Sequence, residues 1–198
     1  MDVDGVMSRR VGEVVESAST SFVAQCYQLH GAPHLGSLVR TGSPEVYGVV
    51  CRVSTEPLDA SRPVLARGES AASEEAVFRD NPQLERLLTS RFEALIAGYR
   101  ENGNDRQFLP PVPPRVHSFV YACTPEEVVR FTSCLDLLRL LINSNVPMSD
   151  EVLGACLREA AVVHPDPAGF LLRAGKSLAV ELAGDLPRLN AVLKKVAP

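Results

Sequence analysis

Closely spaced alternating segments constrain the N-terminal part of the chain more than any other feature. From residue 11 to about residue 54, apolar residues alternate with polar ones, and β-branched or aromatic residues recur between turn-forming residues. This pattern is typical of short strands. The expected strands cover residues 11–17, 20–28, 37–41 and 47–53. Short strands joined by tight connections such as Ala18-Ser19 and Gly42–Glu45 predict an antiparallel barrel rather than an open sheet with helical crossovers.

The next part of the chain mixes loops with single elements. Residues 54–76 are rich in Ser, Ala, Pro and Glu, which predicts a surface loop with one strand near residues 64–67. Asn81-Pro82 is a helix start and predicts a short helix over residues 83–90, and residues 92–99 alternate again as a closing strand. Four prolines within residues 108–115 force an extended strap, and residues 117–123 form the last expected strand.

The C-terminal part has helical periodicity. Thr124-Pro125-Glu126-Glu127 is a strong helix start, and an apolar stripe predicts one helix ending near Asn143. The stripe consists of Val128, Phe131, Leu135, Leu138 and Ile142. Ser149 should cap a second helix that ends at His164–Pro167, and two further helices are expected over residues 168–183 and 186–196. The predicted fold class is α+β: a small closed antiparallel β-barrel over residues 10–123, followed by a helical tail over residues 124–198.

Composition narrows the function classes. The apolar share of 45% includes no uncharged apolar run near the roughly 18–20 residues that a bilayer requires, so no membrane contact is expected. The acidic start Met1–Asp4 differs from a secretory signal and favours the cytoplasm. A net charge of −4 gives no broad attraction to nucleic acid, so direct nucleic-acid binding is not expected. The five widely spaced cysteines form no CxxC pair, and we expect buried apolar thiols.

The order of several motifs resembles the HAS-barrel, a domain shared by HerA-type ATPases and ATP synthase ring subunits. The resemblance rests on Val11–Ser17 followed by Ser19–Phe22, on Gly36–Val39 with Tyr47–Val50, on Asp80–Leu84, and on the strap that leads to His117–Ala122. It covers about residues 11–123. In that family the barrel does no chemistry: it holds the hexamer together and docks a NurA-type nuclease. An ATPase domain with a Walker A loop would follow, whereas here the remaining residues have helical patterns, so the resemblance implies a contact role.

Two fragments could carry chemistry. Gly175-Lys176-Ser177 matches the end of a P-loop, but the first glycine would fall at Phe170, so neither binding nor hydrolysis of ATP is expected. His30 and His34 have the i, i+4 spacing of a metal pair, but Gly31-Ala32-Pro33 breaks the helix that this spacing requires. We therefore predict no catalytic, cofactor-binding or metal-binding residue.

The sequence thus favours a non-catalytic binding or assembly module related to the barrel of HerA-type DNA-processing ATPases. The candidate contact surfaces are the loop at His34-Leu35 and the loop Leu58–Glu69. The expected partners are a second copy, in a dimer or weak oligomer, a motor ATPase or a nuclease. The alternative is a subunit of a DNA-processing nuclease or hydrolase whose active site is completed in a complex. Activity measured with and without Mg²⁺ or Mn²⁺ separates the two.

Overall fold

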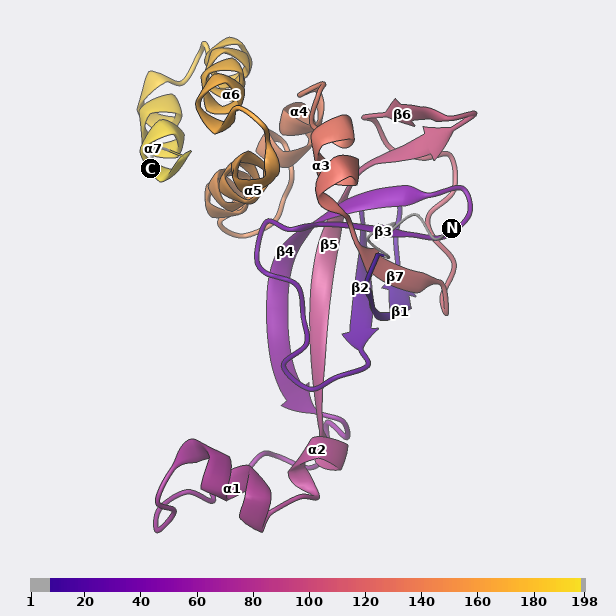
Figure 1. The fold of residues 1–198 in the computed structure, drawn as a ribbon, viewed down its shortest axis with the longest axis vertical. Helices are drawn as coiled ribbons and strands as arrows, with labels where there is room; N and C mark the ends of the chain where they lie inside the picture. Colours follow the sequence, from indigo (N-terminus) through magenta and orange to yellow (C-terminus); the bar gives the residue numbers. More distant parts are fainter. Residues whose placement is uncertain (1–7, 197–198) are drawn as a thin grey trace, which may run out of the picture.

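A computed structural model describes residues 8–196, so the acidic start Met1–Asp4 lies outside the described residues (Figure 1). The strands are β1 (Arg10–Ser17), β2 (Ser21–Cys26), β3 (Leu38–Thr41), β4 (Val46–Pro57), β5 (Leu88–Glu101), β6 (Asn104–Arg106) and β7 (Phe119–Ala122). The helices are α1 (Glu74–Asp80), α2 (Leu84–Leu87), α3 (Pro125–Phe131), α4 (Leu137–Ile142), α5 (Ser149–Val163), α6 (Pro167–Glu181) and α7 (Leu186–Val196). Within residues 8–196, no helix has the length and apolarity to cross a membrane.

The strands form one antiparallel sheet that rings round on itself. Their order is β2-β1-β7-β3-β4-β5-β6, and an additional pairing joins β2 to β5. The pairings of β1, β2, β5, β4, β3 and β7 therefore make a closed circuit, which we call the ring, while β6 pairs only with the end of β5. The expected α+β class is confirmed, with an antiparallel sheet followed by C-terminal helices.

Alternation along the strands fills the inside of the ring. In β2 the buried residues Phe22, Ala24 and Cys26 alternate with half-buried ones, as the sequence pattern predicts for a strand with one buried face. These side chains belong to an inner core. Its buried members are Val11, Val14, Phe22, Ala24, Cys26, Val39, Val46, Val50, Phe92, Ala94, Ile96, Tyr99 and Val120.

The C-terminal helices cover the outer face of the ring at β3, β4 and β5. Leu38, Tyr47, Val49, Leu95 and Ala97 face outward and share a second core with α3 to α7. Figure 1 shows these helices grouped beside the upper part of β4 and β5. Both faces of the two strands are covered there, so every residue from Val46 to Cys51 is buried.

Arg130 of α3 ties the helices to the ring by charge as well as by packing. Its Nη2 donates to the Tyr47 hydroxyl at 2.7 Å and its Nε donates to Asp105 Oδ2 at 2.9 Å. Arg40 of β3 is paired with Glu127, with 2.8 Å between Nε and Oε1. These interactions join α3 to strands β3, β4 and β6. They therefore hold the start of the helical region against the sheet.

The segment between β4 and β5 differs most from the sequence expectation. The helix predicted over residues 83–90 is wrong beyond α2, because Leu88 to Arg91 pair with Ser54 to Pro57 and belong to β5. The strand predicted near residues 64–67 is not formed, and α1 begins at Glu74, inside the loop expected over residues 54–76. Cross-strand hydrogen bonds outweigh the weak helical preference of a short leucine-rich segment.

The single helix predicted from Thr124 to Asn143 is also wrong, although its start is confirmed. Thr124 and Glu127 form a capping box, with Glu127 N donating to Thr124 Oγ1 at 3.3 Å and Thr124 N donating to Glu127 Oε2 at 2.8 Å. The helix then breaks after Phe131. At the break, the Gln107 amide donates to the carbonyls of Phe131 and Cys134.

The later helices follow the sequence pattern closely. The predicted interruption at His164–Pro167 separates α5 from α6. Ser149 is the first residue of α5 rather than its cap, which is Met148. Of the cysteines, Cys26, Cys51 and Cys156 are buried as expected, but Cys134 is exposed. Burial raises the pKa of the Cys51 and Cys156 thiols to about 12, which keeps them neutral.

Candidate functional site

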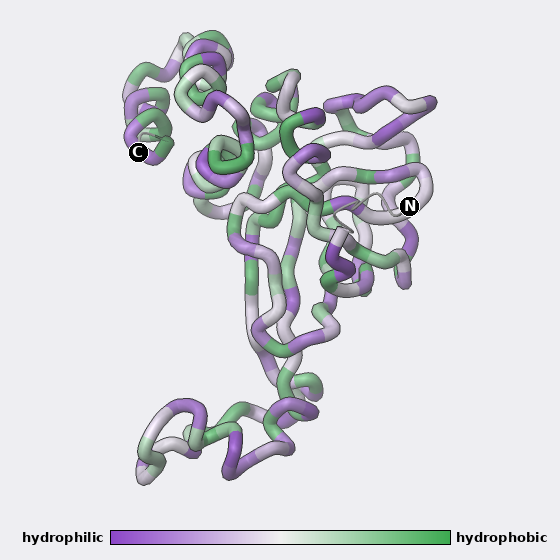
Figure 2. The backbone as a smooth tube through the Cα atoms, viewed as in Figure 1, coloured by the Kyte–Doolittle hydropathy of each residue, from purple (hydrophilic) through white to green (hydrophobic). Residues whose placement is uncertain are grey.

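Strands β4 and β5 carry the intervening residues beyond the end of the ring, and we call residues 58–87 the arm. Figure 1 shows its helices α1 and α2 below the sheet and away from α3 to α7. Every residue from Leu58 to Ser70 is exposed, a stretch that contains the Leu58–Glu69 loop predicted as a contact surface. In Figure 2 hydrophobic and hydrophilic segments alternate along the arm. The arm therefore presents apolar side chains without a covering layer from the described residues.

A groove of about 250 Å³ runs between the first residues of the arm and α2. Leu58 N donates to the Leu87 carbonyl at 2.8 Å, which holds the two sides of the groove together at its base. Leu58 is 59% exposed, Val64 55% and Leu65 67%. Leu84 is buried and lies in the lining. The groove is thus an apolar surface fixed at one end by the β4–β5 ladder.

Arginines surround this groove. Arg62, Arg67 and Arg86 line it, with Asp59 as the single acidic member of the lining. Arg62 Nε lies 3.3 Å from Asp59 Oδ2, and both side chains are mostly exposed. Ser61 donates to Asp59 Oδ1 from its backbone N at 3.0 Å and from its hydroxyl at 2.7 Å, and these bonds lower the pKa of Asp59. Asp59 is therefore held as a carboxylate at the turn.

The other predicted contact loop, at His34-Leu35, lies against α5. His34 is exposed, with its Nδ1 3.8 Å from Glu159 Oε1, and Leu35 is also exposed. Gly36 anchors the loop: its φ is +86°, and a Cβ there would lie 2.5 Å from the backbone of Ala155. His34 also lines a hollow of about 270 Å³ between this loop and α3 and α5.

The structure does not bring the two contact loops together as one surface. The loop adjoins the arm at His30, near its start, where the His30 ring meets the Phe78 ring edge-on at 6.0 Å. His30 and His34 thus have different neighbours, Phe78 and Glu159. Within residues 8–196, no three His, Cys, Asp or Glu side chains are grouped as metal ligands.

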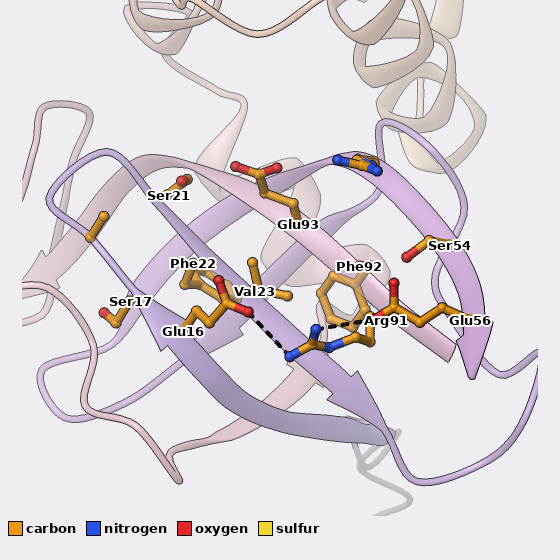
Figure 3. Close-up of a pocket in the computed structure, with 12 residues that line it drawn as sticks. Glu16, Ser17, Ser21, Phe22, Val23, Ser54, Glu56, Arg91, Phe92 and Glu93 are labelled. Atoms are coloured by element: carbon orange, nitrogen blue, oxygen red, sulfur yellow. Dashed lines mark hydrogen bonds and ion pairs between the residues drawn. The ribbon is translucent and has the colours of Figure 1, made fainter. Parts of the chain in front are cut away.

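A third hollow, of about 380 Å³, lies beside β1, β2, β4 and β5 and contains charged residues (Figure 3). Arg91 bridges two glutamates there, with Nη2 3.2 Å from Glu16 Oε1 and Nη1 3.0 Å from Glu56 Oε1. Sequence reasoning missed this group because its members come from three strands, with no local motif. The carboxylate oxygens pair with arginine, so the group connects the strands electrostatically.

The P-loop fragment has no phosphate cradle around it. Gly175-Lys176-Ser177 lies inside α6, where the backbone N–H groups make helical hydrogen bonds. A Cβ at Gly175 would be 3.6 Å from Leu193, so this glycine faces α7. Gly175 thus belongs to a helix–helix contact, while Lys176 is exposed on the surface of α6.

Two comparisons with known proteins found no match to this chain. No protein-family model matches the chain, and a search of curated proteins finds no similar sequence.

Proposed function

We propose that this chain is a cytoplasmic, non-catalytic assembly module in which the ring is a HAS-type β-barrel and the arm docks a partner protein. The closed circuit of strand pairings supports a barrel. The motif order from Val11–Ser17 to His117–Ala122 supports the HAS type. The observation that carries the function is the arm, which projects exposed Leu58, Val64, Leu65 and Leu87 beyond the ring.

Energetics favour an intermolecular role for these side chains. Each fully buried aliphatic side chain contributes about 1.5–3 kcal/mol relative to exposure. An exposed apolar patch that a fold holds in place commonly marks a protein contact. The β4–β5 ladder, continued by the hydrogen bond between Leu58 and Leu87, already fixes the base of the arm. Less conformational entropy of the arm is therefore lost when a partner binds.

The resemblance supplies the partner classes. Barrels of the HerA family stand side by side in a ring and dock a nuclease, and a ring contact joins two different faces of each subunit. Contacts made through the ring alone are smaller than those of a subunit that also associates through ATPase domains. We propose a dimer or weak oligomer in isolation, and docking onto a motor ATPase or a nuclease in the assembly.

Mixing experiments with the full chain test this function. The chain is combined with a HerA-type ATPase and with a NurA-type nuclease from the same organism, and complexes are measured by size-exclusion chromatography with light scattering. We expect a complex with at least one of them, weakened about tenfold or more by Val64→Asp with Leu65→Asp, because a buried charge replaces two apolar contacts. Leu35→Asp tests the second loop in the same way.

The matched control places the same charges on the helical region. Val162 and Val180 are 81% and 74% exposed on α5 and α6, so Val162→Asp with Val180→Asp should leave the complex intact. A chain that is a strict monomer at every concentration and captures neither partner would refute the assembly role. Cleavage of DNA by the purified chain with Mg²⁺ or Mn²⁺ would instead support the nuclease or hydrolase alternative.

A further inference from the structure

We infer that the groove of the arm binds an acidic, aliphatic segment of a partner protein, an inference that rests on the proposed docking function. The groove supplies two features that an occupant must match. Its lining is apolar at Leu58, Val64, Leu65 and Leu87, and basic at Arg62, Arg67 and Arg86. Leucine-type side chains flanked by carboxylates match both.

Charge is unevenly distributed on the arm. Residues 58–87 contain six acidic and four basic residues, so the arm as a whole is acidic. Three of the four arginines nevertheless line the groove, together with only one of the acids. The positive charge is therefore a property of the groove and opposes the net charge of the molecule, which is −4.

The groove arginines can form ion pairs with the carboxylates of a bound segment. Among residues 8–196, the ion pair of Arg62 is the exposed one with Asp59, a kind of pair that contributes little. Arg67 Nη1 donates to the neutral Asn81 side chain at 3.4 Å. For Arg86, no ion pair is present within residues 8–196. Guanidinium groups bind carboxylates with two parallel hydrogen bonds, which suits Asp and Glu of a docked segment.

Size and symmetry favour a peptide segment over a small molecule or a groove-to-groove dimer. A volume of about 250 Å³ is below the roughly 300–1,000 Å³ of small-molecule sites, so a few side chains of a segment fit better than a free ligand. In a two-fold symmetric dimer of arms, each subunit would contribute the same groove surface to the interface. Arg62, Arg67 and Arg86 would then face one another and repel. This repulsion disfavours a groove-to-groove dimer, and we take the occupant to be a segment of a different protein.

Selection of short random peptides on phage, with the full chain as bait, tests the inference directly. Enriched peptides should combine Asp or Glu with Leu, Ile, Val or Met. A synthetic peptide from the enriched set is then measured by fluorescence anisotropy. Its affinity should fall about tenfold or more for the triple variant Arg62→Glu, Arg67→Glu and Arg86→Glu, and in high salt. The same peptide with lysine at its acidic positions should not bind.

The control variant changes three exposed arginines elsewhere, Arg115→Glu, Arg139→Glu and Arg173→Glu, and should bind the peptide as the unmodified chain does. A milder triple variant with glutamine at the groove positions guards against loss of the fold, which unchanged thermal melting verifies. Enrichment of basic or neutral peptides, equal binding to the groove variant, or no enrichment at all would overturn the inference. The docking function survives those outcomes if Val64→Asp with Leu65→Asp still weakens the partner complex, so the two failures are distinguishable.

Discussion

At the scale of single residues, two glycines with similar positive φ angles have very different surroundings. Gly36 and Gly103 have φ values of +86° and +80°, a region that side chains with a Cβ rarely adopt. A Cβ at Gly36 would meet the backbone of α5 at 2.5 Å, whereas a Cβ at Gly103 would meet nothing within 4 Å. Substituting alanine at both positions therefore distinguishes backbone strain, which affects both, from steric overlap, which affects only Gly36.

We predict that Gly36→Ala lowers the free energy of unfolding by about 3 kcal/mol or more, since strain and overlap combine. Gly103→Ala should cost only about 1–2 kcal/mol from its φ alone. Urea denaturation followed by circular dichroism measures both. Equal losses in the two variants would show that the contact between the His34 loop and α5 is loose.

A buried histidine provides a pH dependence. His164 stacks on Phe170 with 4.0 Å between ring centroids, and its Nε2 lies 2.7 Å from the Thr132 hydroxyl. Burial lowers the pKa of His164 below its usual value of 6.5, and the charge of Arg173 adds to this effect. The folded chain therefore favours the neutral ring, while the unfolded chain takes up a proton near the usual pKa.

Stability linked to His164 should be fully present above about pH 6.5 and be lost as the pH falls from that value toward the lower pKa of the folded state. We predict that the urea midpoint drops between about pH 7.5 and pH 5.5, and that His164→Gln reduces this drop. The variant should also be less stable at the higher pH because the ring stack is lost. An unchanged pH dependence in His164→Gln would assign the effect to other groups.

At the scale of elements, one side chain from outside the helices determines where a helix ends. Gln107 follows β6, and its amide donates to the carbonyls of Phe131 and Cys134, while its Oε1 accepts from Leu137 N at 2.8 Å. These backbone groups lack helical partners because α3 stops and α4 begins there. Gln107 thus compensates for the break.

We predict that Gln107→Ala lowers the free energy of unfolding by about 1–3 kcal/mol, because it leaves backbone groups near the core without a partner. Gln28→Ala, at an exposed position in the loop after β2, is the matched control and should change little. Chemical denaturation of both variants is the measurement. A neutral Gln107→Ala would mean that water replaces the amide at the break.

Gln107 also shows why the sequence predicts some elements and not others. The stripe from Val128 to Ile142 has continuous helical spacing, so local periodicity cannot reveal a break that depends on a residue far earlier in the chain. Likewise, the extension of β5 to Leu88 depends on pairing with Pro57 across the arm. Strands β1 and β2 were predictable because their alternation reflects one buried face.

The candidate site was predictable only in part. The exposure of the Leu58–Glu69 loop follows from its composition, and this prediction is confirmed. The basic groove could not be predicted from the sequence. Arg62 and Arg86 lie far apart in the sequence and line one groove only because the first residues of the arm fold beside α2. A contact role for His34 and Leu35 stays a prediction.

At the scale of the whole molecule, two hydrophobic cores share one wall. Val50 and Ile96 face the inner core, while Val49 and Leu95 of the same strands face the helices. Removal of the helices would therefore expose the outer face of β4 and β5. The sheet depends on the helical region even though its own pairings are closed.

We predict that truncation after Thr124 gives an aggregating or unfolded product, because buried side chains such as Tyr47, Val49 and Leu95 become exposed. The matched control deletes the arm: Pro57 and Leu88 are paired, so an Asn-Gly turn can join them. Thermal melting and light scattering should show a folded monomer or weak oligomer for this second deletion. A soluble, cooperatively melting truncation product would mean that the helices are an independent appendage.

The pairing of Pro57 with Leu88 also has an evolutionary consequence. Insertions, deletions and substitutions between these two positions leave the packing of both cores untouched, so mutations can accumulate there at low cost to folding. Descendants of an ancestral gene can thus acquire new specificities at one hairpin tip while the ring changes slowly under the constraint of its interior. Divergence among homologues should then be greatest in residues 58–87.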